Sequence, residues 1–138
     1  MAFILEWGEI LKPMKIVLCS ENPLYARNLA NALENNISFQ VTGTVPEEEM
    51  VFYTSASQPD IVLWKVSEYK KYSSRLKQIR FCCPAAYLFI LTDNPGHTEI
   101  TTMLDMEITA CLPTMLSPAQ IANAVELSID GGLMYWGI

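Results

Sequence analysis

The chain has 138 residues and a formal net charge of −6, and 51% of its residues are hydrophobic while 17% are charged. This length and composition predict one ordered domain that buries its own core, and they exclude a chain dominated by disordered segments. The negative charge argues against nonspecific nucleic-acid binding, because affinity for DNA begins with Lys and Arg side chains that neutralise phosphates.

Along the chain, short apolar runs typical of buried strands alternate with longer amphipathic runs typical of helices. In chain order, the expected elements are a strand at 15–20, a helix at 23–36, a strand at 39–44, a helix at 47–57, a strand at 60–66, a helix at 68–82, a strand at 86–92, a helix at 97–106, a strand at 108–113 and a helix at 117–132. Parallel strands need such helical crossovers, so the pattern predicts an α/β fold with a parallel sheet covered by helices on both faces.

Several residues mark where these helices begin and end. The clearest helix, at 117–132, has Ser117 as its cap, Pro118 in its first turn and two glycines, 131–132, at its end. Pro23 is preset for the first helix, and the three acids at 47–49 suit the positive end of the next helix dipole.

Sheets of this kind bind their ligands at the carboxyl ends of the strands. In this chain those ends are residues 19–22, 43–44, 65–67, 92–94 and 113–115. Any chemistry of the domain is expected there.

Cys19 is the most tempting nucleophile at this edge, but the residues around it do not support catalysis. A cysteine phosphatase has the pattern C-x5-R, and Tyr25 stands where the arginine is needed. The loop also lacks the glycines that let a backbone curl around an oxyanion. We interpret all four cysteines as reduced structural residues, with oxidation of the adjacent Cys82 and Cys83 as the alternative.

Signals for nucleotides and metals are also missing. Neither G-x-G-x-x-G nor G-x-x-x-x-G-K-[ST] occurs in the sequence. His97 is the only histidine, so a histidine-based metal cluster or catalytic triad cannot be assembled, and a helix-cap role is favoured for it. We expect no cofactor and no metal, and we expect the protein not to be an enzyme.

The apolar stretches do not indicate a membrane protein. The longest, such as residues 85–91, fall short of the roughly 20 residues that a membrane helix needs. Residues 1–13, "MAFILEWGEILKP", lack the basic start and small-residue cleavage site of a secretory signal. We expect a cytoplasmic protein whose first 13 residues are an extension that packs on the domain or on its partner, or that has no role.

The stretches "KIVLCSENPLYARNLANALE", "QPDIVLWKV", "FILTDN" and "TACLPTMLSPAQIANAVELSIDGG" carry a resemblance to a known family. Their order and spacing resemble the receiver domain of two-component response regulators, particularly the LuxR-like transcription regulators. The resemblance covers residues 14–132 and implies a flavodoxin-like (βα)5 fold, doubly wound, with strand order 2-1-3-4-5. Residues 133–138 are then a tail or the start of a linker to an output domain.

Receivers of that family hold Mg²⁺ with two acids after the first strand and phosphorylate an aspartate at the end of the third strand. They also use a hydroxyl after the fourth strand and a lysine after the fifth. On this sequence the acid pair falls on Ser20 and Glu21, the phosphoacceptor on Lys65, the hydroxyl on Thr92 and the lysine on Thr114. An ammonium cannot replace a carboxylate as phosphoryl acceptor or as a ligand of Mg²⁺, so the resemblance implies a degenerate phosphorylation corner.

Lys65 places a positive charge about where the metal lies in the family. We therefore expect an internal ion pair between Lys65 and Glu21, with Asp93 as a further carboxylate near it. The alternative is that Lys65 extends into solvent from the end of its strand.

Tyr135 and Trp136 form an aromatic pair near the C-terminus, where an unpacked tail rarely keeps one. We expect them to contact a second copy or a neighbouring domain, or else to cap the core.

The sequence thus predicts a pseudo-receiver that regulates through protein contact or as a homodimer, as the N-terminal half of a LuxR-like transcription regulator. We expect contact with DNA only through an output domain outside residues 1–138, and the alternative is a stand-alone receiver without one. Two alternatives remain: a small-ligand sensor that uses the former phosphorylation corner, and a flavodoxin-like enzyme that acts through Cys19.

Overall fold

The computed structural model describes residues 3–4, 10–131 and 135–136, and the side chains of residues 12–130. Its strands are β1 (Phe3–Ile4), β2 (Ile10–Leu11), β3 (Met14–Cys19), β4 (Phe39–Val45), β5 (Ile61–Lys65), β6 (Tyr87–Leu91), β7 (Ala110–Leu112) and β8 (Tyr135–Trp136). Its helices are α1 (Pro23–Glu34), α2 (Glu47–Ser57), α3 (Tyr72–Cys82), α4 (His97–Asp105) and α5 (Pro118–Gly131).

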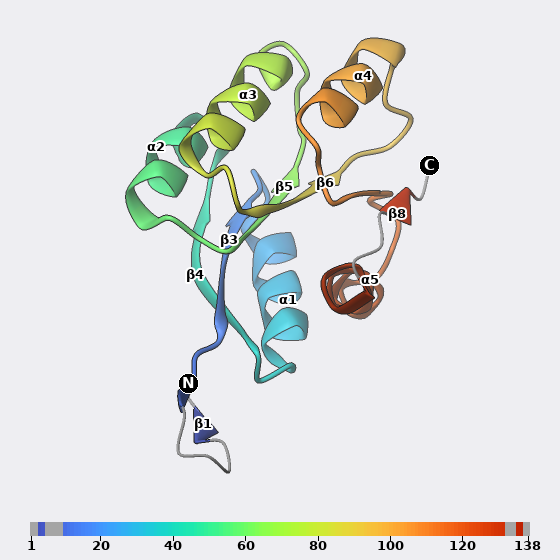
Figure 1. The fold of residues 1–138 in the computed structure, drawn as a ribbon. Helices are drawn as coiled ribbons and strands as arrows, with labels where there is room; N and C mark the ends of the chain where they lie inside the picture. Colours follow the sequence, from blue (N-terminus) through green and yellow to red (C-terminus); the bar gives the residue numbers. More distant parts are fainter. Residues whose placement is uncertain (1–2, 5–9, 132–134, 137–138) are drawn as a thin grey trace.

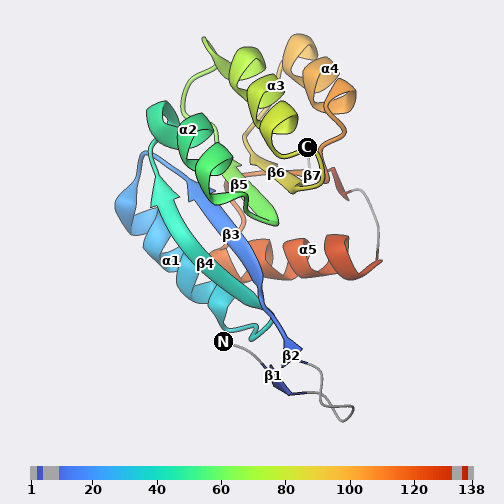
Figure 2. The same cartoon turned by 60° about the vertical axis from the view of Figure 1, so that its left-hand side comes forward.

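The main sheet is parallel and has the order β4-β3-β5-β6-β7-β8. Its first five strands are the five expected from the sequence, and their order is the expected 2-1-3-4-5. Helices α2, α3 and α4 cover one face of the sheet, and α1 and α5 cover the other (Figures 1 and 2). The doubly wound flavodoxin-like fold is therefore confirmed.

Each face of the sheet has its own buried core, because alternate residues of a strand point to opposite faces. On β3, Val17 belongs to the cluster that packs under α2, α3 and α4, whereas Ile16 and Leu18 belong to the cluster under α1 and α5. Residues 16–19 are all buried. This explains why the strands read as continuous apolar runs rather than as alternating ones.

β8 is an element that the sequence did not predict. Its backbone pairs in parallel with β7, with Tyr135 opposite Ala110 and Trp136 opposite Cys111. The side chains of Tyr135 and Trp136 lie outside the described residues, so their expected role as an interface stays a prediction.

The extension expected at 1–13 is described at residues 3–4 and 10–13. There β1 and β2 form a two-stranded antiparallel ladder, with Phe3 opposite Leu11 and Ile4 opposite Ile10. Figure 2 shows this ladder at the amino end of β3, away from the carboxyl edge of the main sheet.

Helix α3 begins at Tyr72, four residues later than expected. The residues before it form a loop in which the Val66 amide donates to the Leu91 carbonyl and the Tyr72 amide donates to the Tyr69 carbonyl. Local helix propensity at 68–71 is therefore overridden by tertiary contacts at the carboxyl edge of the sheet.

Candidate functional site

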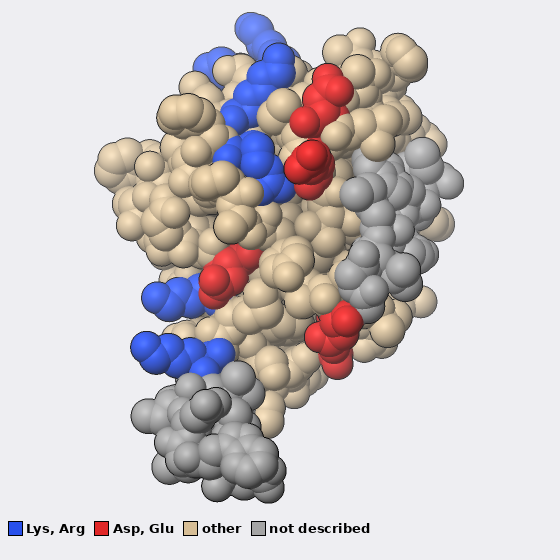
Figure 3. All heavy atoms as spheres, viewed as in Figure 1, with Lys and Arg blue, Asp and Glu red and all other residues tan. Residues whose placement is uncertain are grey.

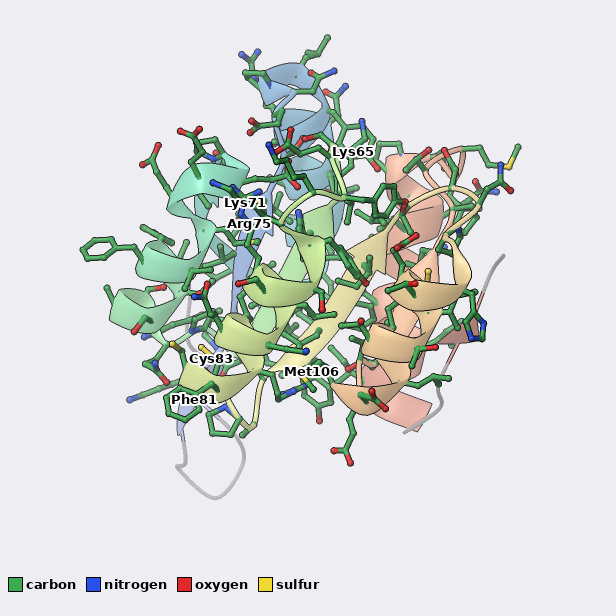
Figure 4. All side chains as sticks on the ribbon, turned by 90° about the horizontal axis from the view of Figure 1, so that it is seen from above. Lys65, Lys71, Arg75, Phe81, Cys83 and Met106 are labelled. Atoms are coloured by element: carbon green, nitrogen blue, oxygen red, sulfur yellow. The ribbon has the colours of Figure 1, made fainter. Side chains whose placement is uncertain are left out.

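The carboxyl ends of β3, β5, β6 and β7 bring the expected corner residues to one edge of the molecule. Glu21 follows β3, Lys65 ends β5, Thr92 follows β6 and Thr114 follows β7. Figure 4 looks down on this edge and shows Lys65 there, with Lys71 and Arg75 of the α3 region nearby. The edge is the one at which ligands bind in sheets of this kind.

Lys65 contacts an aromatic ring rather than Glu21. Its Nζ lies 4.1 Å from the centre of the Tyr25 ring, a distance typical of a cation–π interaction. Tyr25 is fixed in the first turn of α1, where its amide donates to the Asn22 side chain over 3.1 Å. The half-buried Lys65 side chain thus connects the end of β5 to the start of α1.

Glu21 has a different partner. Its Oε2 accepts a hydrogen bond of 3.1 Å from the Glu47 amide at the start of α2. Pro46 precedes that helix and provides no side-chain cap, so the Glu21 carboxylate takes the capping role and faces the positive end of the helix dipole. The expected Glu21–Lys65 ion pair is replaced by these two separate contacts.

Glu47 is a residue whose role the sequence did not reveal. The residue is 3% exposed, and its carboxylate accepts hydrogen bonds from Trp64 Nε1 over 2.8 Å and from both the amide and the hydroxyl of Ser67. A buried carboxylate is tolerated because these donors replace water. The signal was present in Trp64, since an indole N–H in a fully buried strand needs an acceptor.

Thr92 and Thr114 also have internal partners. The buried Thr92 hydroxyl forms a hydrogen bond with the Tyr69 hydroxyl. Thr114 donates its amide to Asp93 Oδ1 over 2.9 Å and its hydroxyl to Asp93 Oδ2. Both threonine hydroxyls at the corner are therefore engaged with neighbouring side chains.

Asp93 is the corner carboxylate whose pKa is lowered. The main causes are the hydrogen bonds from the Thr114 side chain and amide, and the Lys65 charge makes the smallest contribution. The Lys65 charge therefore lowers this pKa less than the Thr114 hydrogen bonds do.

Ser20 completes a local turn. Its hydroxyl oxygen accepts from the Asn22 amide over 3.1 Å, and its amide donates to the Val45 carbonyl over 3.0 Å. Within the described residues, no group of three or more His, Cys, Asp or Glu side chains is arranged to hold a metal ion. The corner residues therefore share one edge of the sheet but are distributed over separate pairs.

Cys19 is buried beneath this edge, with 1% of its surface exposed. Burial, followed by the charges of Glu47 and Glu21, raises the pKa of its thiol far above the ordinary value. A protonated, buried thiol is a poor nucleophile, which argues against the enzyme alternative.

Comparison with solved structures identifies the architecture. The structure superposes on the isolated receiver domain of RcsB from Salmonella enterica serovar Typhimurium, solved with the phosphomimetic BeF3-, with a TM-score of 0.75 and 16% sequence identity; the match covers 91% of this chain and 94% of that one. The chain has the fold of a response-regulator receiver domain.

Two further structures support this assignment of the fold. A LuxR-family response regulator from Aurantimonas sp. SI85-9A1 matches with a TM-score of 0.74 and 18% identity, over 90% of this chain and 89% of that one. The receiver domain of the NarL response regulator from Mycobacterium tuberculosis matches with a TM-score of 0.72 and 16% identity, over 87% of this chain and 98% of that one. At these identities the likeness is one of fold.

No protein-family model and no curated protein matches the sequence. Among the described residues, no helix combines the length and the apolar character needed to cross a bilayer.

Proposed function

We propose that this receiver-like domain is a signalling module that works without phosphorylation and acts through contacts with other proteins. The observation that carries the proposal is Lys65, whose ammonium stands at the phosphoacceptor position implied by the resemblance and lies on the Tyr25 ring. Receiver domains are signalling modules, and the fold of this chain supports a role of that class.

The chemistry of the corner supports this proposal. An ammonium group can neither accept a phosphoryl group as an acyl phosphate nor coordinate Mg²⁺, which takes oxygen ligands. Glu21, the remaining acid of the implied pair, is used to cap α2. Thr114 stands where the family has a lysine, so the charge that balances an acyl phosphate is also missing.

The proposed module is the N-terminal regulatory domain of a LuxR-like transcription regulator. It contacts a second copy or another protein in the cytoplasm, and DNA is contacted by an output domain outside residues 1–138. The support is the likeness of fold to the RcsB, NarL and LuxR-family regulators.

The test is to incubate the protein with acetyl phosphate or with beryllofluoride in the presence of Mg²⁺. Intact mass and size-exclusion light scattering are then measured. We expect an unchanged mass and an unchanged assembly. A stable gain of one phosphoryl group, or a change of assembly, would overturn the proposal.

A Lys65→Asp variant provides the matched comparison. It places a carboxylate at the acceptor position and leaves the rest of the corner as it is. If this variant gains a phosphoryl group while the wild type does not, Lys65 alone accounts for the inertness. If neither does, the capping role of Glu21 and the missing lysine at Thr114 contribute as well.

A second candidate function, sensing of a small ligand at the same corner, is favoured by the Tyr25 hydroxyl. This hydroxyl is buried without a hydrogen-bond partner among the described residues. Burying an unpaired hydroxyl is costly, and a polar ligand group would offset that cost. A thermal-shift screen with small metabolites tests the idea, because a ligand that binds only the folded state raises the melting temperature. The same shift in a Tyr25→Phe variant would count against it.

A further inference from the structure

Opposite charges are segregated along this chain. The α3 region, residues 68–82, holds five of the nine Lys and Arg residues: Lys70, Lys71, Arg75, Lys77 and Arg80. After Arg80 the sequence contains no Lys or Arg, but it contains six acids: Asp93, Glu99, Asp105, Glu107, Glu126 and Asp130. The basic helix is therefore followed by elements whose charged residues are all acidic apart from His97.

The fold places these two kinds of charge side by side. Helices α3 and α4 are neighbours on one face of the sheet (Figure 1). In the space-filling view, the blue atoms over α3 run next to red atoms at the end of α4 (Figure 3). The surface thus has a basic strip and an acidic strip that share a boundary.

Arg80 links the two helices of this pair. Its guanidinium donates from Nε to the Met106 carbonyl over 2.9 Å and from Nη2 to the Glu107 carbonyl over 3.2 Å. These bonds join the C-terminal end of α3 to the C-terminal end of α4. A preorganised surface loses little entropy when a partner docks.

One large apolar side chain is exposed beside the charges. Phe81, on α3 next to Arg80, is 86% exposed. In Figure 4, Phe81 and Met106 lie on the same side of the molecule. We call the exposed residues Lys77, Phe81, Asp105 and Glu107 the α3–α4 face.

We propose that the α3–α4 face is a self-association surface that takes a second copy of this chain. A twofold axis that lies in the interface, parallel to the boundary between the strips, places the basic strip of each copy on the acidic strip of the other. Such an interface is isologous, so each favourable contact occurs twice. Phe81 supplies apolar area that such a contact buries.

The competing face, formed by α4, β7 and α5, is less suited to a symmetric pair. Neither α4 nor α5 contains Lys or Arg, and their acidic residues outside the α3–α4 face and the groove between α1 and α5 are Glu99 and Asp130. A twofold pair on that face would oppose carboxylates to carboxylates, which is unfavourable. Charge complementarity therefore selects the α3–α4 face over the α4–β7–α5 face.

This inference deepens the proposed function, because it names the partner and the surface. It rests on that function only in taking protein contact as the output of the domain. Its experiment measures assembly, whereas the phosphorylation test measures mass, so the two proposals can fail separately.

The experiment is sedimentation velocity of the full chain over a range of protein concentrations, at about 0.01 M and about 1 M salt, where the Debye lengths are about 30 Å and 3 Å. We expect a concentration-dependent dimer at low salt whose dissociation constant rises at least about tenfold at high salt. A monomer at every concentration in low salt would overturn the proposal.

Charge-swapped variants test the face itself. We expect Lys77→Glu and Asp105→Lys, each alone, to weaken the dimer at least about tenfold, because each introduces two repulsive contacts. The double variant Lys77→Glu/Asp105→Lys is expected to restore it. Phe81→Ser is expected to weaken the dimer at both salt concentrations.

Glu126→Lys on α5 is the matched control, because it makes the same change of charge as Asp105→Lys outside the α3–α4 face. We expect the dissociation constant of its dimer to equal that of the wild type. A dimer that Glu126→Lys alters, while Lys77→Glu and Phe81→Ser leave it intact, would overturn the assignment of the face. Thermal melts of each variant identify any that fail to fold.

Discussion

The Lys65 ammonium lies 4.1 Å from the centre of the Tyr25 ring, so the end of β5 is held against the first turn of α1 by a cation–π contact. The two residues are 40 positions apart in sequence and belong to different elements. This contact holds the positive charge of Lys65 at the carboxyl edge of the sheet.

A double-mutant cycle on this pair measures the contact. We expect Tyr25→Leu to lower the free energy of unfolding more than Tyr25→Phe, by about 0.5–1 kcal/mol, because phenylalanine retains the π-face and leucine does not. In the wild type, Lys65→Met should lower the free energy of unfolding by a similar amount. In the Tyr25→Leu background, the same substitution should lower it no further. Urea unfolding provides the values. Equal costs of Lys65→Met in both backgrounds would show that Lys65 acts elsewhere.

The Asp93–Thr114 contact predicts a pH dependence. Because the folded-state pKa of Asp93 is lowered, the stability from this contact is present above the ordinary value of 3.8 and is lost as the pH falls through the folded-state pKa. Thr114→Val removes the hydroxyl, the largest cause, so the pKa of Asp93 should rise towards its ordinary value. Carboxyl NMR titration of the folded protein measures this pKa.

Lys65→Met is the matched control for that titration, because the Lys65 charge is the smallest cause of the shift. The pKa of Asp93 should therefore rise less in Lys65→Met than in Thr114→Val. The reverse order would mean that an ion pair with Lys65, rather than the threonine, governs this carboxylate.

The sequence predicted the order of strands and helices because this information is local. Apolar runs and turn residues are read within a few positions, and a βα repeat restricts how the strands can be ordered. The partners at the corner were not predictable in this way. Glu21, Lys65 and Asp93 all reach the same edge, and which of them pair depends on where α1 and α2 begin in space.

Tertiary contacts also decided the remaining differences. Residues 68–71 have helix-forming side chains, yet the Tyr69 hydroxyl forms a hydrogen bond with the Thr92 hydroxyl. Helix α3 therefore starts only at Tyr72. β8 follows the expected helix end after two glycines, and pairing with β7 makes it a strand although it has only two residues. Neither contact leaves a periodic pattern in the sequence.

Adding a side chain at Gly43, on the edge strand β4, is predicted to cause a steric clash. A Cβ at this position would lie 2.4 Å from the Tyr53 hydroxyl oxygen, which donates to the Thr42 carbonyl over 3.0 Å. Gly43→Ala should therefore displace the tyrosine and lower the free energy of unfolding by about 1–3 kcal/mol. In a Tyr53→Ala background the same substitution should cost nothing, since the space is then open. Chemical denaturation of the four proteins checks this, and additive costs would contradict it.

The hydrogen bonds of the Arg80 side chain predict a large loss of stability when it is replaced. Besides its bonds to the end of α4, its Nη1 donates to the Pro84 carbonyl over 2.9 Å and to the Ala86 carbonyl over 3.0 Å. Arg80→Met removes all of these donors and leaves the carbonyls of two loops without them, so we expect a loss of about 2 kcal/mol or more. Arg80→Lys should recover only part of this loss, because an ammonium lacks the planar array of donors.

Arg27 is an exposed arginine on α1, and Arg27→Met is the control. Its free energy of unfolding in urea should stay within about 0.5 kcal/mol of that of the wild type. If Arg80→Met matched Arg27→Met, the carbonyl contacts of Arg80 would contribute nothing to the fold.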